Sequence, residues 1–362
     1  MDTKTNNEQT LYFIGIDQHK HFSQVAVMNP QGEILDEQKL LHEDKQAITD
    51  YFRQFPAPSS EITLEATGHW YWLYDLLDSL GQSPHLAHPL KCKLIAESRI
   101  KTDKIDAKVL ANLLRTNFLP EAFVPDRVTR SLRELLRHRV KLVWTRTTFK
   151  TKIRAVLDKL GIIPPEEFSD LYTQAGVEYL KNLGLESLYQ LEINNYLTIT
   201  LVLTELVKEL DTIIKSQLKH MPQAELLMKQ PGIGYYTAYL LLVEIGDINR
   251  FNSPKKLVSY VGLAPAVHQS GNHIYFGRIT KQGNPYIRTA LIESAYVAIQ
   301  HDDYLKSFYQ RLKATKGTSK AIVATARKLL KNVYFILKGK TPYKSSYYNP
   351  PSVCSADLTG LK

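Results

Sequence analysis

Four acidic residues occupy positions from which their carboxylates could converge on one pocket. Asp17 ends the apolar run FIGID, Glu65 ends the run ITLE, and Asp103 and Asp106 open the helical pattern DKIDAKVLANLLR. Positions i and i+3 share one face of a helix, and α/β sheets place their sites at strand ends. Carboxylates that converge repel one another, and Mg²⁺ or Mn²⁺ relieves that repulsion. Two such ions about 4 Å apart promote phosphodiester transfer. The alternative is four surface acids, two of them favoured by a helix dipole.

A second group of reactive residues lies within residues 262–295. Ser270 precedes Gly271 in a stretch that we expect to be an unstructured polar loop. The basic residues Arg278, Lys281 and Arg288 follow. A serine among cations can attack a phosphodiester, because the cations stabilise the developing oxyanion. A Ser-Gly pair is also an ordinary turn, so the chemistry alone leaves both interpretations open.

Positive charge is concentrated in two segments. Residues 127–159 hold eleven Lys and Arg against two acids, a net +9, and residues 250–340 hold sixteen against three, a net +13. The whole chain carries +10, so the remainder carries −12. This segregation favours a polyanionic partner, because Lys and Arg release the counterions of phosphates; solvated helix faces are the alternative. The expected phosphate contacts are Arg127, Arg130, Arg137, Lys150, Arg154, Arg278, Lys281 and Arg288.

An α/β domain over residues 11–125 is predicted to position the acidic residues. Residues 11–40 contain three expected strands, LYFIGID, FSQVAVMN and EILDEQKL, with a hairpin around PQG. EITLEATG and SPHLAHP predict two more strands, and HWYWLYDLLDSLG and KIDAKVLANLLR predict helices. Strands followed by alternating helix and strand indicate a mixed α/β sheet, and the hairpin after Asp17 matches a ribonuclease-H-like fold.

Residues 126–225 form an expected basic helical and coiled-coil region, interrupted at Pro164 and Pro165. Apolar residues step by four and three along one stretch: Ile199, Leu203, Leu206, Leu210 and Ile213. This short heptad stripe fits either an oligomerisation coiled coil or one helix of a bundle.

Residues 226–340 form the next expected domain, in which PGIG separates two helices. Gly232 and Gly234 would let backbone N–H groups point at a phosphate, the layout of a helix-hairpin-helix, although any tight helix connection can use this sequence. Residues 341–362 lack periodicity and are expected to be a flexible tail.

Composition narrows the class of protein. With 44% apolar and 23% charged residues the chain should form globular domains. The first ten residues are too polar for a signal peptide and no apolar run reaches about 18 residues, so we expect a cytoplasmic protein without a membrane partner. Cys92 and Cys354 are not spaced for zinc, and we expect neither disulfide nor structural zinc.

The motifs occur in one collinear order: FIGIDQHK, LEATGHWYW, KTDKIDAKVLA, a basic helical middle, PGIGYYTAYLLLVEIGDINRF, LVSYVGLAPAVHQSGN and GRITKQGNPYIRTAL. Together they resemble the DEDD transposases of bacterial insertion sequences, the family that includes the Piv and MooV recombinases. The resemblance covers roughly residues 11–340, and the ordered set is far more specific than any single motif.

The resemblance implies a RuvC-like domain whose tetrad, Asp17, Glu65, Asp103 and Asp106, binds two Mg²⁺ or Mn²⁺ ions. It implies a coiled-coil linker and a mostly α-helical C-terminal transposase domain in which Ser270 forms a covalent phosphoserine link. It also implies double-stranded donor and target DNA, a structured bridge RNA as guide, and a dimer or tetramer with composite active sites. Gln269 stands where many relatives have a small polar residue, so the match of Ser270 depends on Gly271 and the GRITKQGN spacing.

Three other functions stay open from the sequence. A RuvC-like structure-specific nuclease would use the tetrad without Ser270, whereas a non-catalytic nucleic-acid-binding protein would use the same domain as a scaffold. A site-specific invertase would differ only in how its DNA sites are arranged. Metal-dependent nicking that survives Ser270→Ala would indicate the nuclease, and binding without cleavage would indicate the scaffold.

Overall fold

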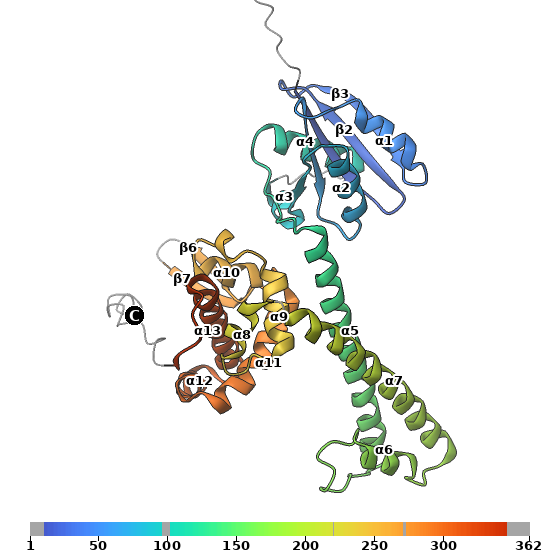
Figure 1. The fold of residues 1–362 in the computed structure, drawn as a ribbon, viewed down its shortest axis with the longest axis vertical. Helices are drawn as coiled ribbons and strands as arrows, with labels where there is room; N and C mark the ends of the chain where they lie inside the picture. The colour runs from blue at the N-terminus through green and yellow to red at the C-terminus, as the bar shows by residue number, and fades with distance from the viewer. Residues whose placement is uncertain (1–10, 96–101, 220, 271–272, 346–362) are drawn as a thin grey trace, which may run out of the picture. The chain divides into compact units, whose positions relative to one another are not determined.

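The protein divides into two compact units, Met1–Val124 and Pro125–Lys362 (Figure 1). The computed structural model describes residues 11–95, 102–219, 221–270 and 273–345. The first unit contains a mixed sheet with helices, and the second consists mainly of helices. This agrees with the expected mixed-sheet domain followed by a helical region.

A five-stranded sheet forms the centre of the first unit. Its strands are β1 Tyr12–Gln18, β2 Phe22–Met28, β3 Ile34–Leu41, β4 Ser60–Glu65 and β5 His85–Ala87. They lie in the order β3-β2-β1-β4-β5, with β1 to β3 antiparallel and β4 and β5 parallel to β1. The three expected N-terminal strands and their hairpin are confirmed. This order and direction of strands are consistent with a ribonuclease-H-like fold.

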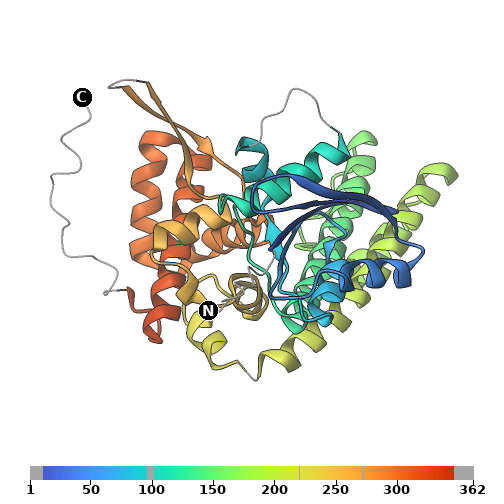
Figure 2. The same ribbon diagram turned by 90° about the horizontal axis from the view of Figure 1, so that it is seen from above.

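In the part of this unit that the structure describes, four helices pack around the sheet: α1 Lys45–Arg53, α2 Trp70–Ser79, α3 Pro89–Ile95 and α4 Asp103–Arg115. Side chains alternate between the faces of a strand, so Ile14 and Ile16 of β1 pack with residues of α1 and α2, while Phe13 packs with α4. Figure 2 shows α1 and α4 on opposite faces of the curved sheet. Residues on the α4 face of β1 are therefore the odd-numbered ones.

The second unit contains α5 Arg127–Lys159, α6 Gln174–Lys181, α7 Ser187–Leu218, α8 Pro222–Met228, α9 Tyr235–Ile245, α10 Pro254–Val261, α11 Pro285–His301, α12 Asp303–Lys316 and α13 Thr318–Gly339. A 3₁₀ turn spans Ile248–Arg250, and a two-stranded sheet is made by β6 Pro265–Ser270 and β7 His273–Ile279. Within the described residues, none of these helices is long and apolar enough to cross a bilayer.

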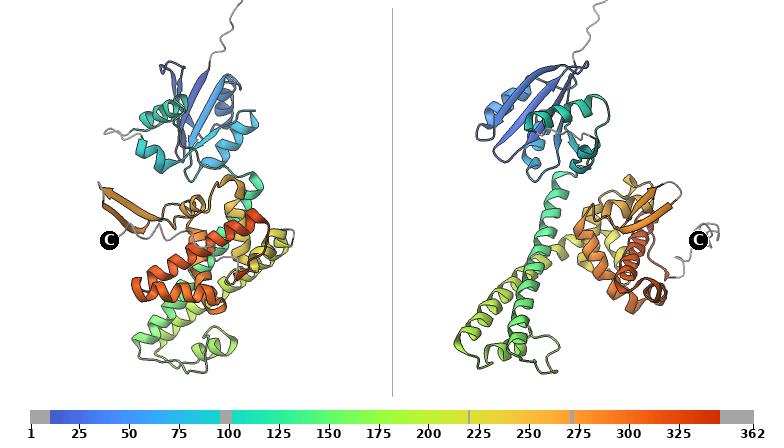
Figure 3. Two further views of the ribbon diagram at one scale, coloured as in Figure 1. Left: turned by 90° about the vertical axis from the view of Figure 1, so that its left-hand side faces the viewer. Right: turned by 180° about the vertical axis from the view of Figure 1, so that it is seen from behind.

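The long helices α5 and α7 pack against each other, and α6 lies where the chain turns from one to the other (Figure 3). Their shared core differs from the expected heptad stripe. Leu203 is buried, but Ile199, Leu206 and Ile213 are 39%, 40% and 42% exposed. The buried side of α7 is offset from this stripe and contains Ile193, Leu197, Thr200, Leu203, Val207 and Ile214. The heptad spacing is real, yet within one chain it does not mark the face that meets α5.

The long helix pair also packs into the C-terminal helices. One apolar cluster joins Leu136 of α5 and Ile214 of α7 to Tyr239 of α9 and Ala290 of α11. A larger apolar core contains residues from all six helices α8, α9, α10, α11, α12 and α13. Residues that we expected to form separate regions on either side of position 225 thus belong to one compact unit.

Candidate functional site

The ends of two parallel strands bring the first two acidic residues close in register. The last aligned pair of β1 and β4 is Ile16 with Leu64, so Asp17 and Glu65 are the next residues on adjacent strands. Both have odd positions and therefore lie on the α4 face of the sheet. Asp17 is only 8% exposed, whereas Glu65 is partly exposed. The sheet thus presents two carboxylates at one edge, on one face.

Helix α4 adds two carboxylates from its first turn. Thr102 caps the helix by accepting a hydrogen bond from the N–H of Ile105, which fixes Asp103 and Asp106 in the first turn. The position of α4 on the sheet is set by Gly15, because a Cβ there would lie 2.1 Å from the carbonyl oxygen of Ala107. Asp103 lies one helical turn before Ala107, and Asp17 lies two residues after Gly15. This packing brings the two aspartates together.

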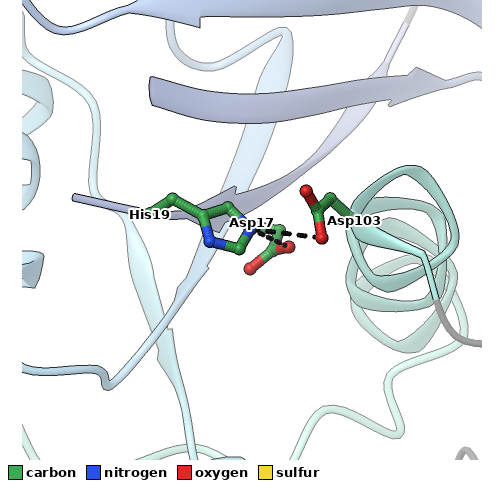
Figure 4. Close-up of side chains that lie close together, drawn as sticks. All are labelled: Asp17, His19 and Asp103. Atoms are coloured by element: carbon green, nitrogen blue, oxygen red, sulfur yellow. Dashed lines mark hydrogen bonds and ion pairs between the residues drawn. The ribbon is translucent and has the colours of Figure 1, made fainter. Parts of the chain in front are cut away.

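His19 completes a cluster that sequence reasoning did not identify as a site. Its Nε2 lies 3.0 Å from Oδ2 of Asp17 and 3.4 Å from Oδ1 of Asp103 (Figure 4). One ligand atom from each of these three residues lies within 4.8 Å of the others. The available signal was the Asp-x-His spacing, which puts both side chains on one side of an extended chain.

Burial and charge shape the ionisation of Asp17. Desolvation raises the pKa of its carboxyl above the usual value, and the neighbouring charges of Asp106 and Asp103 raise it further. The charge and hydrogen bond of His19 oppose this effect. A bound cation would act in the same direction as His19, because positive charge favours the carboxylate form.

The residues at this edge fit a divalent metal. Carboxylate oxygens are the ligands that Mg²⁺ and Mn²⁺ prefer, and an imidazole nitrogen is a common ligand of transition metals. Carboxylate oxygens of Asp17 and Asp103 lie within 4.8 Å of each other, and the charge of Asp106 contributes to the raised pKa of Asp17. Glu65 lies at the end of the adjacent strand, where its charge also acts on Cys92 of α3. The structure thus brings Asp17 and Asp103 together with His19, and places Glu65 at the end of the adjacent strand.

The expectation that Ser270 lies in an unstructured loop is wrong. Ser270 is the last residue of β6, paired in register with His273 of β7. The sequence carried a signal for this hairpin: Gly271 and Asn272, a pair typical of two-residue hairpin loops, stand before the β-favouring residues Ile274, Tyr275 and Phe276. Figure 3 shows the two strands extending from the helices of the second unit.

The base of this hairpin is held by several close contacts. Gly283 has φ +124, and a Cβ there would lie 2.1 Å from the carbonyl oxygen of Tyr260. Arg288 donates hydrogen bonds to the carbonyls of Val261 and Lys281, at 3.0 and 3.3 Å. Arg288, expected to contact phosphate, thus also braces the turn that precedes α11.

Arg137, another expected phosphate contact, binds a buried carboxylate. Its guanidinium donates two hydrogen bonds to Glu244, at 2.7 and 3.0 Å, and Glu244 is 0% exposed. Asn284 donates to the same carboxylate at 2.8 Å, and Arg133 donates to the carbonyls of Val243 and Glu244. The end of α9, the first third of α5 and the start of α11 are joined through one buried charge.

The other expected phosphate contacts differ in exposure. Arg130 is 5% exposed, so little of its side chain reaches the surface. Gly232 packs against α11, where an added Cβ would lie 2.2 Å from the carbonyl of Ser294, while Gly234 caps α9 in open space. Lys150 lies over the ring of Tyr172. The exposed members of the set are Arg127, Arg154, Arg278 and Lys281.

Comparison with protein families gives two matches along the chain. Residues 14–162 match a transposase family described by its DEDD residues and the element IS110, and residues 224–310 match the transposase IS116/IS110/IS902 family. The first match contains the four acidic residues and the second contains Ser270.

Individual relatives agree with these matches. The transposase of insertion sequence element IS1111A from Coxiella burnetii is 26% identical over 78% of this chain and 79% of its own length. The pilin gene-inverting protein of Moraxella bovis is 29% identical over 78% of this chain and 81% of its own length. A transposase of element IS1533 from Leptospira borgpetersenii is 29% identical over 65% of this chain and 70% of its own length.

Proposed function

The chain belongs to the IS110 family of insertion-sequence transposases and is a DNA transposase or recombinase; from this premise we propose that it cuts DNA by metal-dependent, serine-assisted chemistry. The observation that carries the proposal is the convergence of Asp17 and Asp103 at the end of β1, within the match to the DEDD family. Residues 11–125 would supply the metal centre, and residues 226–340 would supply the serine. The reaction takes place on DNA in the cytoplasm.

The proposed metal ligands are Asp17, Glu65, Asp103 and Asp106. Two divalent ions held there, Mg²⁺ or Mn²⁺, would activate the attacking oxygen and stabilise the leaving oxygen. The chain's own contribution is to hold the carboxylates rigidly. Asp17 is buried at the end of a central strand, and α4 is fixed against that strand through Gly15. Rigid ligands keep the reacting phosphate in position and so lower the entropic part of the barrier.

Ser270 is the proposed nucleophile. Its Oγ would bond to phosphorus as the bond between phosphorus and one deoxyribose oxygen breaks, and that oxygen would leave with a proton as a hydroxyl. The phosphoserine link is itself a phosphodiester, so a DNA hydroxyl can attack its phosphorus and release the serine to complete strand transfer. The position of Ser270 at the end of β6, in a hairpin whose base is braced by Arg288, supports this role.

Nucleic-acid contacts are proposed along the two basic segments. Arg127, Arg154, Arg278 and Lys281 are exposed there and suit phosphate binding. The connection between α8 and α9 would act as a helix-hairpin-helix, with N–H groups near Gly234 facing the backbone. A structured guide RNA from the flanking noncoding DNA, paired with donor and target, is the proposed source of sequence specificity.

We also propose that the protein works as a homo-oligomer through α7. Ile199, Val202, Leu206 and Ile213 are exposed on this helix at heptad spacing, and a second copy would cover them. Replacing Leu206 with Glu should shift the mass measured by light scattering toward the monomer. The matched change Glu205→Gln should not alter the mass.

The proposed chemistry is tested in cells that hold the protein, its flanking noncoding DNA and a donor and target plasmid pair. A denaturant-resistant protein–DNA adduct is expected with the natural chain and absent with Ser270→Ala or Asp17→Asn. Controls are Ser259→Ala on the exposed side of α10 and Asp78→Asn at the end of α2, which should both retain the adduct.

The outcomes separate the competing functions. Cleavage without an adduct, unchanged by Ser270→Ala, would make the protein a metal-dependent nuclease. DNA binding with no cleavage under any divalent ion would make the first unit a scaffold. Deleting the flanking noncoding DNA should abolish target choice, and unaltered targeting after the deletion would refute the RNA guide.

A further inference from the structure

A nitrogen donor lies among the carboxylates of the proposed metal centre. Nε2 of His19 approaches Asp17 at 3.0 Å and Asp103 at 3.4 Å (Figure 4). Two ligands of one metal ion, each about 2.1 Å from it and at right angles, lie about 3 Å apart. The observed separations fit atoms that share a coordination sphere, and they fit a hydrogen bond and an ion pair equally well, so the experiment below must separate the two roles.

The imidazole is held in this orientation by the fold. His19 and Phe22 close the turn between β1 and β2, with the N–H of His19 donating to the carbonyl of Phe22 at 2.9 Å. The two rings stack, with centroids 4.7 Å apart and an angle of 25° between the planes. A stacked ring on a tight turn loses little further freedom when it binds a ligand, so the nitrogen is prepared for coordination.

The turn itself is anchored from the neighbouring strand. His42, just after β3, donates its backbone N–H to the carbonyl of His21, and its ring lies 2.8 Å from the hydroxyl of Ser23. Ser23 and Asp17 are both nearly inaccessible to solvent. The nitrogen donor is therefore placed by the same rigid hairpin that carries the first carboxylate.

We propose that His19 is a direct metal ligand through Nε2. Because of this nitrogen, the metal-binding position that includes His19 favours Mn²⁺ and other transition-metal ions over Mg²⁺. The inference rests on the proposed metal-dependent function. Imidazole nitrogen binds divalent transition metals well, whereas Mg²⁺ strongly prefers oxygen ligands. With Asp17 and Asp103, His19 offers one nitrogen and two oxygens from one side, leaving other positions for water or phosphate.

A different role for His19 predicts a different result. As a charged partner that only neutralises the two aspartates, it would move aside when a cation takes its place. In that case the metal would bind oxygen atoms alone, and removing His19 would leave the preference between ions unchanged. Detection of a metal-bound nitrogen separates the two roles.

The test uses the purified full chain with Mn²⁺ and pulsed electron paramagnetic resonance, which detects coupling to a directly bound imidazole nitrogen. We expect this coupling in the natural chain and in His21→Asn, the matched change of an exposed histidine in the same turn. His19→Asn should lose the coupling and bind Mn²⁺ about tenfold or more weakly. Its affinity for Mg²⁺, measured by competition, should change by no more than about twofold.

The experiment distinguishes an error in the role of His19 from an error in the proposed metal centre as a whole. Mn²⁺ bound without nitrogen coupling, at equal affinity in His19→Asn and weakened by Asp17→Asn, would overturn the role of His19 while leaving the carboxylate site intact. If Asp17→Asn did not affect Mn²⁺ binding, or the natural chain bound none, the proposed centre and the role of His19 would both be wrong.

Discussion

Gly15 of β1 lies against the backbone of Ala107 in α4 so closely that no side chain fits between them. A Cβ on Gly15 would also lie 2.5 Å from the amide nitrogen of Ala111, so the strand and the helix touch through their main chains. Because Asp17 and Asp103 lie just beyond this contact, its distance determines whether the two carboxylates can share a metal.

Gly15→Ala should therefore weaken both folding and metal binding. Overpacking costs typically about 1–3 kcal/mol, and contact with main-chain atoms leaves α4 little room to adjust. We expect a loss of that size in the free energy of unfolding by urea, together with weaker Mn²⁺ binding. Gly68→Ala is the control, since nothing lies within 4 Å of a Cβ there. Equal metal binding by the two variants would show that α4 is not held through Gly15.

Substitution of Arg137 should lower the free energy of unfolding, because its side chain binds a buried carboxylate. Substitution of Arg278 should instead weaken DNA binding, because its side chain is exposed to solvent. Arg137→Met removes two hydrogen bonds to the buried Glu244 and leaves Arg133, 3.4 Å away, as its remaining cation, so the change should cost about 1.5–3 kcal/mol. Arg278→Ala should leave the free energy of unfolding nearly unchanged and reduce the slope of log binding constant against log salt by about 1. Urea unfolding and DNA binding at several salt concentrations measure both quantities. A reduced slope in Arg137→Met, with unaltered stability, would contradict this assignment.

Stability should fall as the pH drops below about 6.5, in part through His42. Burial lowers the pKa of His42, and His21, His19 and His69 lower it further, against the effect of the Lys20 carbonyl. The unfolded chain then binds a proton at higher pH than the folded chain does. The stabilisation is thus complete above the unfolded pKa of about 6.5 and is lost as the pH falls toward the folded value.

Urea unfolding at pH 7.5 and pH 5.5 tests this dependence on His42. In His42→Gln the difference in unfolding free energy between the two pH values should be smaller than in the natural chain. His138→Gln, an exposed change in α5, should retain the natural difference. An identical difference in all three proteins would assign the acid sensitivity to other groups.

The alkylation rate of the Cys92 thiol should report on the charge of Glu65. Burial raises the pKa of the Cys92 thiol to about 11, and the charge of Glu65 contributes to the increase. In a Cys354→Ser background, alkylation by iodoacetamide at pH 8 should be about a hundredfold slower in the folded chain than in urea, because the thiolate is the reactive form. Glu65→Gln should accelerate the reaction, and so should a divalent ion bound by Glu65.

The control for this experiment is Glu61→Gln, a change near the opposite end of the same strand. It should leave the alkylation rate of Cys92 unaltered with and without metal. If divalent ions accelerate alkylation equally in the natural chain and in Glu65→Gln, Glu65 is not a metal ligand.

Local sequence signals predicted the elements but not all of the contacts. Alternating apolar residues predicted β1, β2 and β3, and the helical period after Thr102 predicted α4 with its two aspartates. The partnership of His19 with Asp103 joins residues 84 positions apart and depends on the Gly15 contact, which no local pattern encodes. Arg137 was interpreted from its basic surroundings, although its partner Glu244 lies 107 positions away. Charge counts along a segment do not distinguish a cation facing solvent from one inside a core.

The order of the acidic residues along the chain has a consequence for damaged copies of the gene. Asp17 belongs to β1 and Glu65 to β4, but the helix that carries Asp103 and Asp106 comes after β5 and must dock against the sheet. A frameshift or stop codon before α4 yields a fragment with half of the carboxylates, in which Asp17 keeps His19 but lacks Asp103. Such a fragment cannot assemble the proposed cutting centre, so decayed copies of the element would encode products unable to break the host chromosome.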